Sequence, residues 1–218
     1  MAIAPQPIRR IQTEPSARLR DEYRGSRQTV VAVILPSTLH LSHEQFAQLA
    51  AANRDCRLEL TATGEVIVMP PTGGDTGQRN LDIGGQIWWW NRQRQLGKAF
   101  DSSTGFRLPN GAVRSPDASW VSLPHWDALS PEERRRFLPL CPDFAIELVS
   151  ESDTLLMARA KMQEYLENGL QLGWLIDPKT RLVEVYRPGH PPAEQSEPAT
   201  LSGESLLPGF ILELRAIW

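Results

Sequence analysis

The densest hydrophobic pattern of the chain lies in residues 142–177 and predicts a strand, a helix and a second strand. Apolar side chains point to both faces of the first strand, residues 143–149, so we expect this strand to be covered on both sides. Alternate residues form the two faces: Phe144, Ile146 and Leu148 on one, and Ala145, Glu147 and Val149 on the other. Glu147 breaks the pattern, because an unpaired buried carboxylate would cost several kcal/mol. It therefore needs a cation, a metal ion or a proton.

The helix that follows supplies a candidate partner for Glu147. Its pattern covers residues 153–168 and ends at Gly169, and an apolar stripe marks its buried side. Lys161 and Tyr165 are four residues apart and lie on one face beside this stripe. Lys161 is therefore either the cation that pairs with Glu147 or a lysine that extends its amine to solvent.

Shorter patterns upstream contain two more acidic candidates. Residues 56–69 alternate as two strands around a turn, and Glu59 lies in the first of them. Glu59 fits an ordinary solvent-facing position and a third acid of a site equally well. Asp117 follows a proline inside a strand pattern of residues 113–123, which suits an edge strand or a bend.

A Gly-rich loop at residues 70–78 leads into a predicted helix over residues 79–96. The loop lacks the lysine of a P-loop and the spacing of a dinucleotide-binding motif, so we expect a structural connection. The helix contains Trp88, Trp89 and Trp90, which cannot share one face, and at least one of them should point away from the core. Packing against another helix or a second subunit is the favoured interpretation, which makes a homodimer one hypothesis. Stacking on a base is the alternative.

Composition agrees with one globular domain, because 41% of the 218 residues are hydrophobic and 22% are charged. Residues 1–28 hold six arginines and three acidic residues, so their net charge of +3 leaves −6 for the rest of a chain with −3 in total. We expect residues 1–28 to be a basic, flexible segment, with a nucleic-acid-binding arm as the alternative, and residues 29–218 to form a single domain. The acidic total gives no general attraction to nucleic acid, so such a contact must be local.

Two cysteines, Cys56 and Cys141, lie far apart and match no metal-binding spacing. Reduced thiols in the cytoplasm are favoured over a disulfide. No apolar run approaches the roughly 18 residues of a membrane span, and the N-terminus has no signal-peptide pattern. We therefore expect a cytoplasmic protein that does not enter a membrane.

The acidic candidates indicate two kinds of chemistry. Asp117 and Glu147 come from neighbouring predicted strands, and two carboxylates suit a hard divalent cation such as Mg²⁺, which keeps several waters. Such an ion activates water and stabilises charge on a phosphoryl oxygen, and a nearby lysine can orient the water or hold the phosphate. A plain buried salt bridge between Glu147 and Lys161 explains the same residues equally well.

A set of short segments carries a likeness to a known family. They are PPTGG (70–74), GFRLPNG (105–111), SPD (115–117), PDFAIELVSESD (142–153), KMQEYLENG (161–169), GWLIDP (173–178) and VYRPG (185–189). Together they resemble the Uma-two (Uma2) family, bacterial proteins described as restriction-endonuclease-like members of the PD-(D/E)XK superfamily. The likeness covers roughly residues 36–218, nearly the whole chain beyond the basic segment.

The resemblance implies an α/β (α+β) fold, a restriction-endonuclease-like core in which helices flank a mixed β-sheet. The Asp of the family's PD motif falls on Asp117, and the acidic residue of the second half falls on Glu147. Val149 stands where a lysine is expected, and Lys161 on the next helix matches the alternative position used by some superfamily members. Tyr165 on the same face is similar to the tyrosine of a helix-borne Gln-xxx-Tyr pair in some related nucleases.

The activity implied by the resemblance is an endonuclease that hydrolyses DNA phosphodiester bonds. Asp117 and Glu147 would hold Mg²⁺, or Mn²⁺ in its place, Lys161 would assist catalysis, and Glu59 would support the site. A catalytically inactive nuclease-fold module that binds nucleic acid or protein is the alternative, because Val149 replaces the motif lysine.

Overall fold

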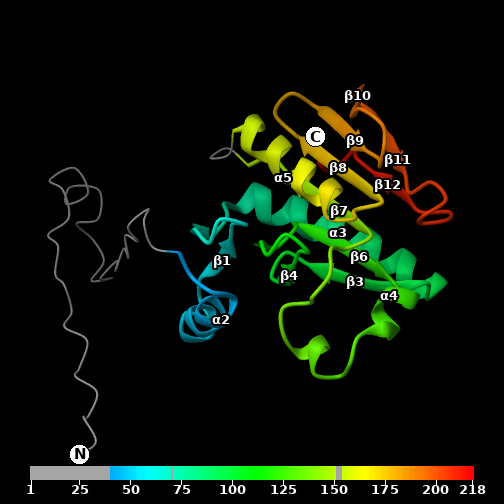
Figure 1. The fold of residues 1–218 in the computed structure, drawn as a ribbon. Coiled ribbons are helices and arrows are strands. Elements are labelled where there is room, and N and C mark those ends of the chain that lie inside the picture. Colours follow the sequence, from blue (N-terminus) through cyan, green and yellow to red (C-terminus); the bar gives the residue numbers. More distant parts are fainter. Residues whose placement is uncertain (1–39, 70, 151–153) are drawn as a thin grey trace, which may run out of the picture. The chain divides into compact units, whose positions relative to one another are not determined.

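The computed structural model describes residues 40–69, 71–150 and 154–218, and its central element is a six-stranded mixed sheet (Figure 1). The strands are ordered β10-β9-β8-β7-β6-β3, and only β7 and β8 run parallel. Their bounds are β3 Gly97–Asp101, β6 Ala118–Ser122, β7 Phe144–Leu148, β8 Leu172–Asp177, β9 Leu182–Tyr186 and β10 Ala193–Ser196. This confirms the predicted mixed sheet, with the Glu147 strand near its centre.

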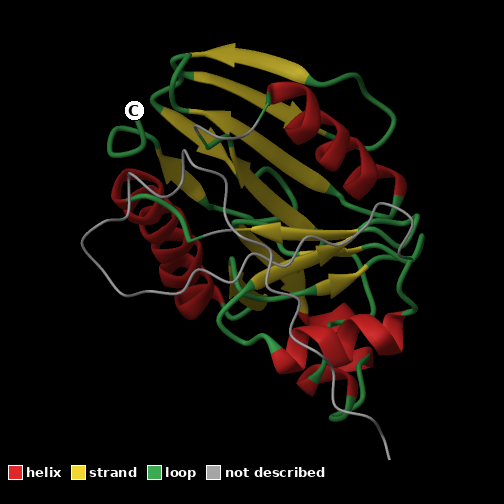
Figure 2. Ribbon diagram, turned by 90° about the vertical axis from the view of Figure 1, so that its left-hand side faces the viewer, coloured by secondary structure: helices red, strands yellow, loops and turns green. Residues whose placement is uncertain are grey.

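Helices α3 (Gly74–Arg94) and α5 (Leu155–Glu167) cover opposite faces of this sheet (Figure 2). Ile146 of β7 belongs to the core on the α3 side, whereas Ala145 belongs to the core on the α5 side. All five residues of β7 are buried, as expected for a strand covered on both sides. The alternation turns Glu147 toward α5, the helix that carries Lys161.

A second sheet stands beside the first and brings in the earlier part of the chain. Its four strands are ordered β2-β1-β5-β4, and helix α2 packs on it through the buried Phe46. The remaining pair, β11 and β12, adds apolar side chains to the α3 core. The bounds are α2 His43–Ala52, β1 Arg57–Leu60, β2 Val66–Met69, β4 Phe106–Arg107, β5 Val113–Arg114, α4 Leu123–Ala128, β11 Thr200–Ser202 and β12 Ile211–Glu213, with a short 3₁₀ helix at Glu133–Arg135.

Several local predictions need correction. Helix α3 begins at Gly74, inside the predicted loop, and ends at Arg94, where the capping residue Gln95 has a left-handed backbone conformation. The strand pattern of residues 113–123 divides into β5 and β6, and Asp117 lies at the break. The sequence pattern gave no indication of the edge strand β10, because its four side chains are all exposed.

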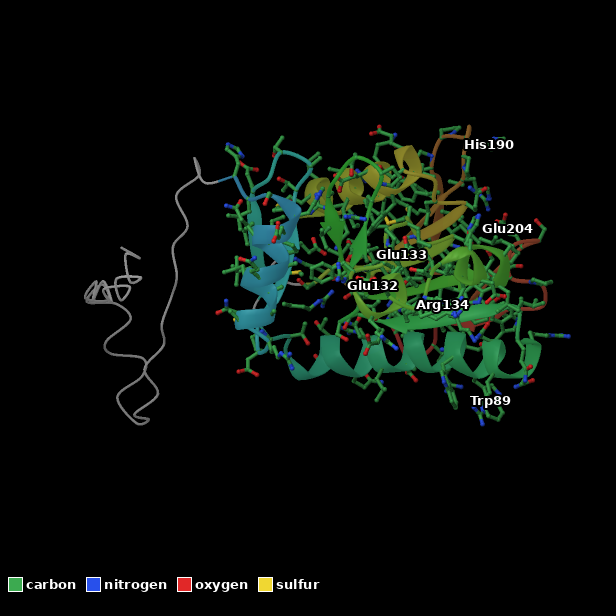
Figure 3. All side chains as sticks on the ribbon, turned by 60° about the horizontal axis from the view of Figure 1, so that its bottom comes forward. Trp89, Glu132, Glu133, Arg134, His190 and Glu204 are labelled. Atoms are coloured by element: carbon green, nitrogen blue, oxygen red, sulfur yellow. The ribbon has the colours of Figure 1, made fainter. Side chains whose placement is uncertain are left out.

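The three tryptophans divide between core and surface as expected. Trp90 is buried, whereas Trp88 and Trp89 are 53% and 60% exposed, and Figure 3 shows Trp89 projecting from the outer side of α3. Cys56 and Cys141 are free thiols, although Cys56 is exposed. None of the helices within the described residues is long and apolar enough to cross a membrane. The basic segment of residues 1–28 lies outside the described residues, so its flexibility and the start of the domain at residue 29 stay predictions.

Two glycines set how closely neighbouring elements pack. A side chain on Gly173 of β8 would collide with Met162 Cε of α5 and would lie 2.7 Å from Leu170 Cδ2. At Gly97 of β3, a Cβ atom would overlap the Val121 carbonyl oxygen and the Trp120 ring of the neighbouring strand. Backbone and a buried indole cannot move aside as a flexible side chain can.

Gly97→Ala is expected to destabilise the fold by about 1–3 kcal/mol, because the added methyl group overpacks the β3–β6 contact. Urea denaturation measures this loss, and Gly85→Ala is the matched control. A Cβ atom on Gly85 meets nothing within 4 Å, and alanine favours a helix more than glycine does, so the control should gain about 1 kcal/mol. Equal stabilities of the two variants would refute this account of Gly97.

Candidate active site

Asp117 and Glu147 are brought together by the pairing of β6 with β7. Ala118 lies opposite Ile146 in this antiparallel pair, so the residues just outside that rung, Asp117 and Glu147, are neighbours across the strands. The Leu148 amide donates a hydrogen bond of 2.9 Å to Asp117 Oδ2. Asp117 is thereby fixed to the strand that carries Glu147, at the point where β6 begins.

Lys161 is bound between two carboxylates. Its Nζ atom lies 2.9 Å from Glu147 Oε1 and 2.9 Å from Glu59 Oε1. The lysine side chain is 17% exposed, and the two glutamates are buried. The helix therefore supplies the cation that the Glu147 strand requires, and the same ammonium links the two sheets.

Glu59 reaches this cluster from β1 of the second sheet. Its Oε1 accepts a hydrogen bond of 2.9 Å from the Ser115 amide, and its Oε2 lies 3.2 Å from Arg114 Nη1. Arg114 Nε in turn donates to Glu164 Oε2 at 2.6 Å. Acidic and basic groups therefore alternate from Glu164 on the surface of α5 through to Glu147.

Tyr165 completes the coordination of Glu147. Its hydroxyl donates a hydrogen bond of 2.9 Å to Glu147 Oε1, the same oxygen that contacts Lys161. Lys161 and Tyr165 are one helical turn apart on α5, so both donors reach one carboxylate oxygen. The spacing of these two residues in the sequence predicted this shared face.

Burial and neighbouring charge shift the ionisation of the cluster in different directions. Burial, together with the charges of Asp117 and Glu59, raises the pKa of Glu147 to about 7, because Lys161 only partly offsets them. Burial alone would lower the pKa of Lys161, but Glu147 and Glu59 outweigh it and raise that pKa. The pKa of Glu59 is lowered, because Lys161, the Ser115 amide and Arg114 together overcome its burial. Lys161 is thus held protonated by Glu59 even when Glu147 takes up a proton.

All four residues predicted from the sequence meet in one cluster. Sequence reasoning missed Arg114, which closes the chain of charges, and it missed Arg57 and Asn80, which contact Asp117. Asn80 Nδ2 donates to Asp117 Oδ1 at 3.1 Å, and Arg57 Nη2 lies 3.7 Å from the same oxygen. Arg114 precedes the SPD segment directly, and this proximity was the one signal that could have revealed it.

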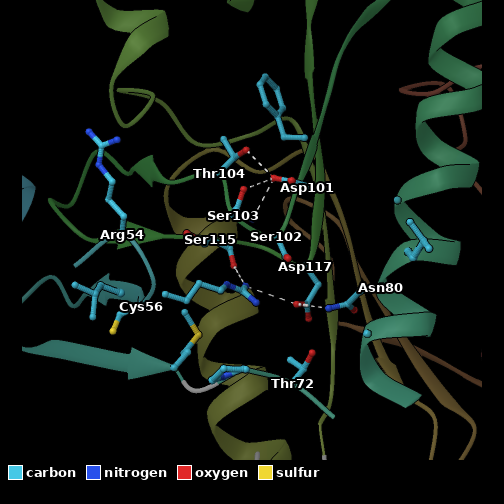
Figure 4. A pocket seen from close by; sticks show the side chains of 18 of the residues that line it. Arg54, Cys56, Thr72, Asn80, Asp101, Ser102, Ser103, Thr104, Ser115 and Asp117 are labelled. Carbon is cyan, nitrogen blue, oxygen red and sulfur yellow. Dashed lines mark hydrogen bonds and ion pairs between the residues drawn. The ribbon is translucent and has the colours of Figure 1, made fainter. Parts of the chain in front are cut away.

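A cavity of about 1070 Å³ opens beside Asp117. Figure 4 shows Asn80 of α3 on one side of Asp117, with Ser102, Ser103 and Thr104 above it and Cys56 across the cavity. Among the described residues, Arg57 Nε and Asn80 Oδ1 are buried polar atoms with no hydrogen-bond partner, and both residues line this cavity. Polar groups that need a partner therefore stand next to Asp117.

The donor set fits a divalent cation of the Mg²⁺ type. Asp117 and Glu147 provide two carboxylates that repel each other when both are ionised, and Asn80 Oδ1 is a neutral oxygen without a partner among the described residues. Mg²⁺ commonly binds to one or two carboxylates and keeps water or phosphate oxygens at its other positions. Within residues 40–69, 71–150 and 154–218, however, no cluster of three or more His, Cys, Asp or Glu side chains is placed to hold a metal. The set suits an ion shared with a substrate better than a closed structural site.

Comparison with solved structures identifies the class of fold. A crystal structure from Anabaena variabilis ATCC 29413, described as that of a "putative nuclease belonging to DUF820", matches with a TM-score of 0.59 and 24% identity, over 69% of this chain and 82% of that one. At this identity the likeness shows the fold alone, which is that of an α+β domain with a mixed central sheet. No curated protein matches the chain.

The family follows from the sequence match. The model of Uma2, described as "Putative restriction endonuclease", matches residues 43–215, which include every residue of the cluster. The chain belongs to the Uma2 family.

Glu147 should make the stability of the protein depend on pH. Its pKa rises from 4.5 in the unfolded chain to about 7 in the fold, so folding favours the protonated form. The resulting stabilisation is complete below pH 4.5 and is lost as the pH rises through about 7. The stability of Glu147→Gln relative to wild type should therefore increase between pH 5 and pH 8, by up to about 3 kcal/mol. Urea denaturation at both pH values measures it, and an unchanged difference would contradict the raised pKa.

Lys161→Met should destabilise the protein by about 3–5 kcal/mol at pH 8, because it leaves Glu59 and Glu147 buried without their shared cation. The loss should be smaller at pH 5, where Glu147 can be protonated. The double variant Lys161→Met/Glu147→Gln should recover part of the stability, as measured by urea denaturation. A surface ion pair provides the control: Arg181→Met breaks the exposed contact with Glu197 and should cost less than about 1 kcal/mol.

Proposed function

We propose that this protein is a divalent-metal-dependent endonuclease that hydrolyses DNA phosphodiester bonds. The observation that carries the proposal is the position of Lys161, which contacts Glu59 and Glu147 at 2.9 Å each beside Asp117. A scattered set of the same residues would have favoured a binding module. Membership of the Uma2 family supports the reaction class.

Lys161 acts as a fixed positive charge in this proposal. Its raised pKa keeps the ammonium protonated, so it does not accept a proton from water. It can instead stabilise the negative charge that grows on the scissile phosphate and orient the attacking water. Glu59 contacts the ammonium and not the substrate, and we assign it the role of a positioning residue.

Asp117 and Glu147 would hold the divalent ion, with Mg²⁺ as the expected metal and Mn²⁺ as a substitute. When bound, the ion supplies Lewis-acid stabilisation of phosphate charge. In the hydrolysis, the oxygen of water bonds to phosphorus while one bridging P–O bond breaks. The water gives up one proton and the leaving oxygen gains one. Without the ion the pKa of Glu147 is raised to about 7, and binding of the divalent cation would favour the ionised carboxylate.

The second candidate function is a nuclease-fold module that binds nucleic acid or protein without cutting. Val149 favours it, because this residue replaces the lysine expected two positions after the acidic residue. Lys161 can replace the lysine missing at position 149, because its Nζ contacts Glu147 from α5. Activity decides between the two candidates.

Cleavage of supercoiled and linear DNA in Mg²⁺ and in Mn²⁺ tests the proposal. Asp117→Asn, Glu147→Gln and Lys161→Met should each lower the cleavage rate by at least about 100-fold, because each removes charge from the reacting centre. The matched control is Glu184→Gln. Glu184 is also a buried strand glutamate, bonded at 2.7 Å to Arg159 of α5 and at 2.6 Å to the Tyr186 hydroxyl.

The control variant should lose stability and keep its cleavage rate per folded molecule. Calorimetric titration of Mg²⁺ separates loss of metal binding from loss of fold, because Glu147→Gln should abolish the heat that wild type and Glu184→Gln both show. A wild type that cleaves no DNA or RNA with either metal would leave the binding module as the function. Cleavage by Glu147→Gln at the wild-type rate would overturn the site.

A further inference from the structure

One face of α3 lines the cavity. It begins near Asp117 and continues along the helix beyond the charged cluster. The residues of this face recur at helical spacing and all line the cavity: Gly77, Asn80, Leu81, Gly84, Gly85 and Trp88. Asn80 contacts Asp117, and Trp88 lies eight residues further along the helix, a distance of about 12 Å. The face therefore connects Asp117 with an exposed indole.

Two glycines form the middle of this face, although the packing of the described residues leaves room for a side chain at both positions. A Cβ atom built on Gly84 or Gly85 would meet nothing within 4 Å, so no neighbouring part of the described chain requires the absence of a side chain. Glycine in a helix interior is less favourable than alanine, and it permits a ligand to approach the backbone closely. The two glycines leave an open floor between Asp117 and Trp88.

The far end of the face combines an aromatic ring with a cation. Trp88 is 53% exposed, and the Arg92 guanidinium lies 5.4 Å from the centre of its ring. Exposed aromatic rings beside basic groups are the usual elements of single-strand nucleic-acid binding, because every base can stack on a ring while the cation attracts phosphate. Trp89 is equally exposed but does not line the cavity.

We propose that this face of α3 binds one strand of the nucleic acid, with a base stacked on Trp88 and the backbone crossing Gly84 and Gly85 toward Asp117. The proposal rests on the proposed function and deepens it, because it names an unpaired strand as the substrate form. An unpaired strand can extend beyond the duplex rise of about 3.4 Å per nucleotide, so Trp88 holds a base at most about three to four nucleotides from the scissile bond.

Charge along the cavity is compatible with this ligand. Arg54 and Arg57 stand against Asp55, Asp101 and Asp117 in the lining, a net charge of −1 that a divalent ion at Asp117 would change to +1. Asp101 is largely occupied by its own turn, since its Oδ1 accepts hydrogen bonds from Ser103 and Thr104. Binding should therefore strengthen when the divalent ion is present.

Fluorescence anisotropy with a labelled single-stranded oligonucleotide tests the proposal. It is performed in EDTA, where no metal-dependent cleavage occurs, and repeated with Ca²⁺, a hard divalent cation that takes oxygen ligands and should tighten the binding. Trp88→Ala should weaken binding roughly 5- to 150-fold, the range expected for one stacked base, whereas Trp89→Ala should change it by less than about twofold. The same sequence as a perfect duplex should bind less tightly to wild type and respond less to Trp88→Ala.

A strand that lacks one base can be combined with Trp88→Ala in a thermodynamic cycle, which isolates the stacking contribution to binding. Removal of the base that contacts Trp88 should weaken binding to wild type but not to Trp88→Ala. Gly84→Gln should raise the melting temperature by about 2–4 °C while weakening binding at least tenfold, because it favours the helix and fills the floor. This variant excludes loss of fold as the cause.

No binding of the oligonucleotide to wild type, equal effects of Trp88→Ala and Trp89→Ala, or tight binding by Gly84→Gln would overturn the proposal. A wild-type dimer that Trp88→Ala converts to a monomer would assign the ring to a second copy of the chain. Trp88-dependent binding without any cleavage would leave this inference standing and reject the proposed nuclease activity.

Discussion

The site depends on one ammonium group placed between buried carboxylates of two different sheets. Glu59 and Glu147 would each destabilise the fold if left ionised in the interior without a partner, and Lys161 compensates both at once. Arg114 and the Ser115 amide complete the arrangement around Glu59. The position of β1 against the main sheet, and with it the cavity wall that carries Arg57, is therefore tied to the charge balance of the cluster.

The main sheet contains the same structural device twice. Glu147, Leu175 and Glu184 form one row across β7, β8 and β9, and α5 provides a cation for each glutamate of the row. Each glutamate also accepts a hydrogen bond from a tyrosine hydroxyl. What distinguishes Glu147 is Asp117 on the adjoining strand, because a second carboxylate next to a buried one raises its pKa and creates a place for a cation. A paired buried glutamate alone is therefore no mark of a site.

Much of the fold and most of the site could be predicted from the sequence. The two-sided burial of β7 followed from its alternation, and Glu147, Asp117 and Lys161 followed from the conflict between charge and burial and from the family motifs. Glu59 could not be decided, because a four-residue strand does not reveal which of its faces another sheet will cover. The start of α3 at Gly74 was missed because the glycines of its first turn have poor helix propensity. The edge strand β10 was missed because it is held by pairing with β9, which no local pattern of its four exposed residues indicates.

Gly173 determines how closely α5, which carries Lys161, can approach the main sheet. Met162 lies where a side chain at this position would be, and it is the residue next to Lys161 on α5. The missing side chain on β8 therefore sets the height of the helix above the sheet, and that height in turn fixes the reach of the neighbouring ammonium to both glutamates. A glycine without any functional group thus fixes the distance between a lysine and the glutamates that other strands supply.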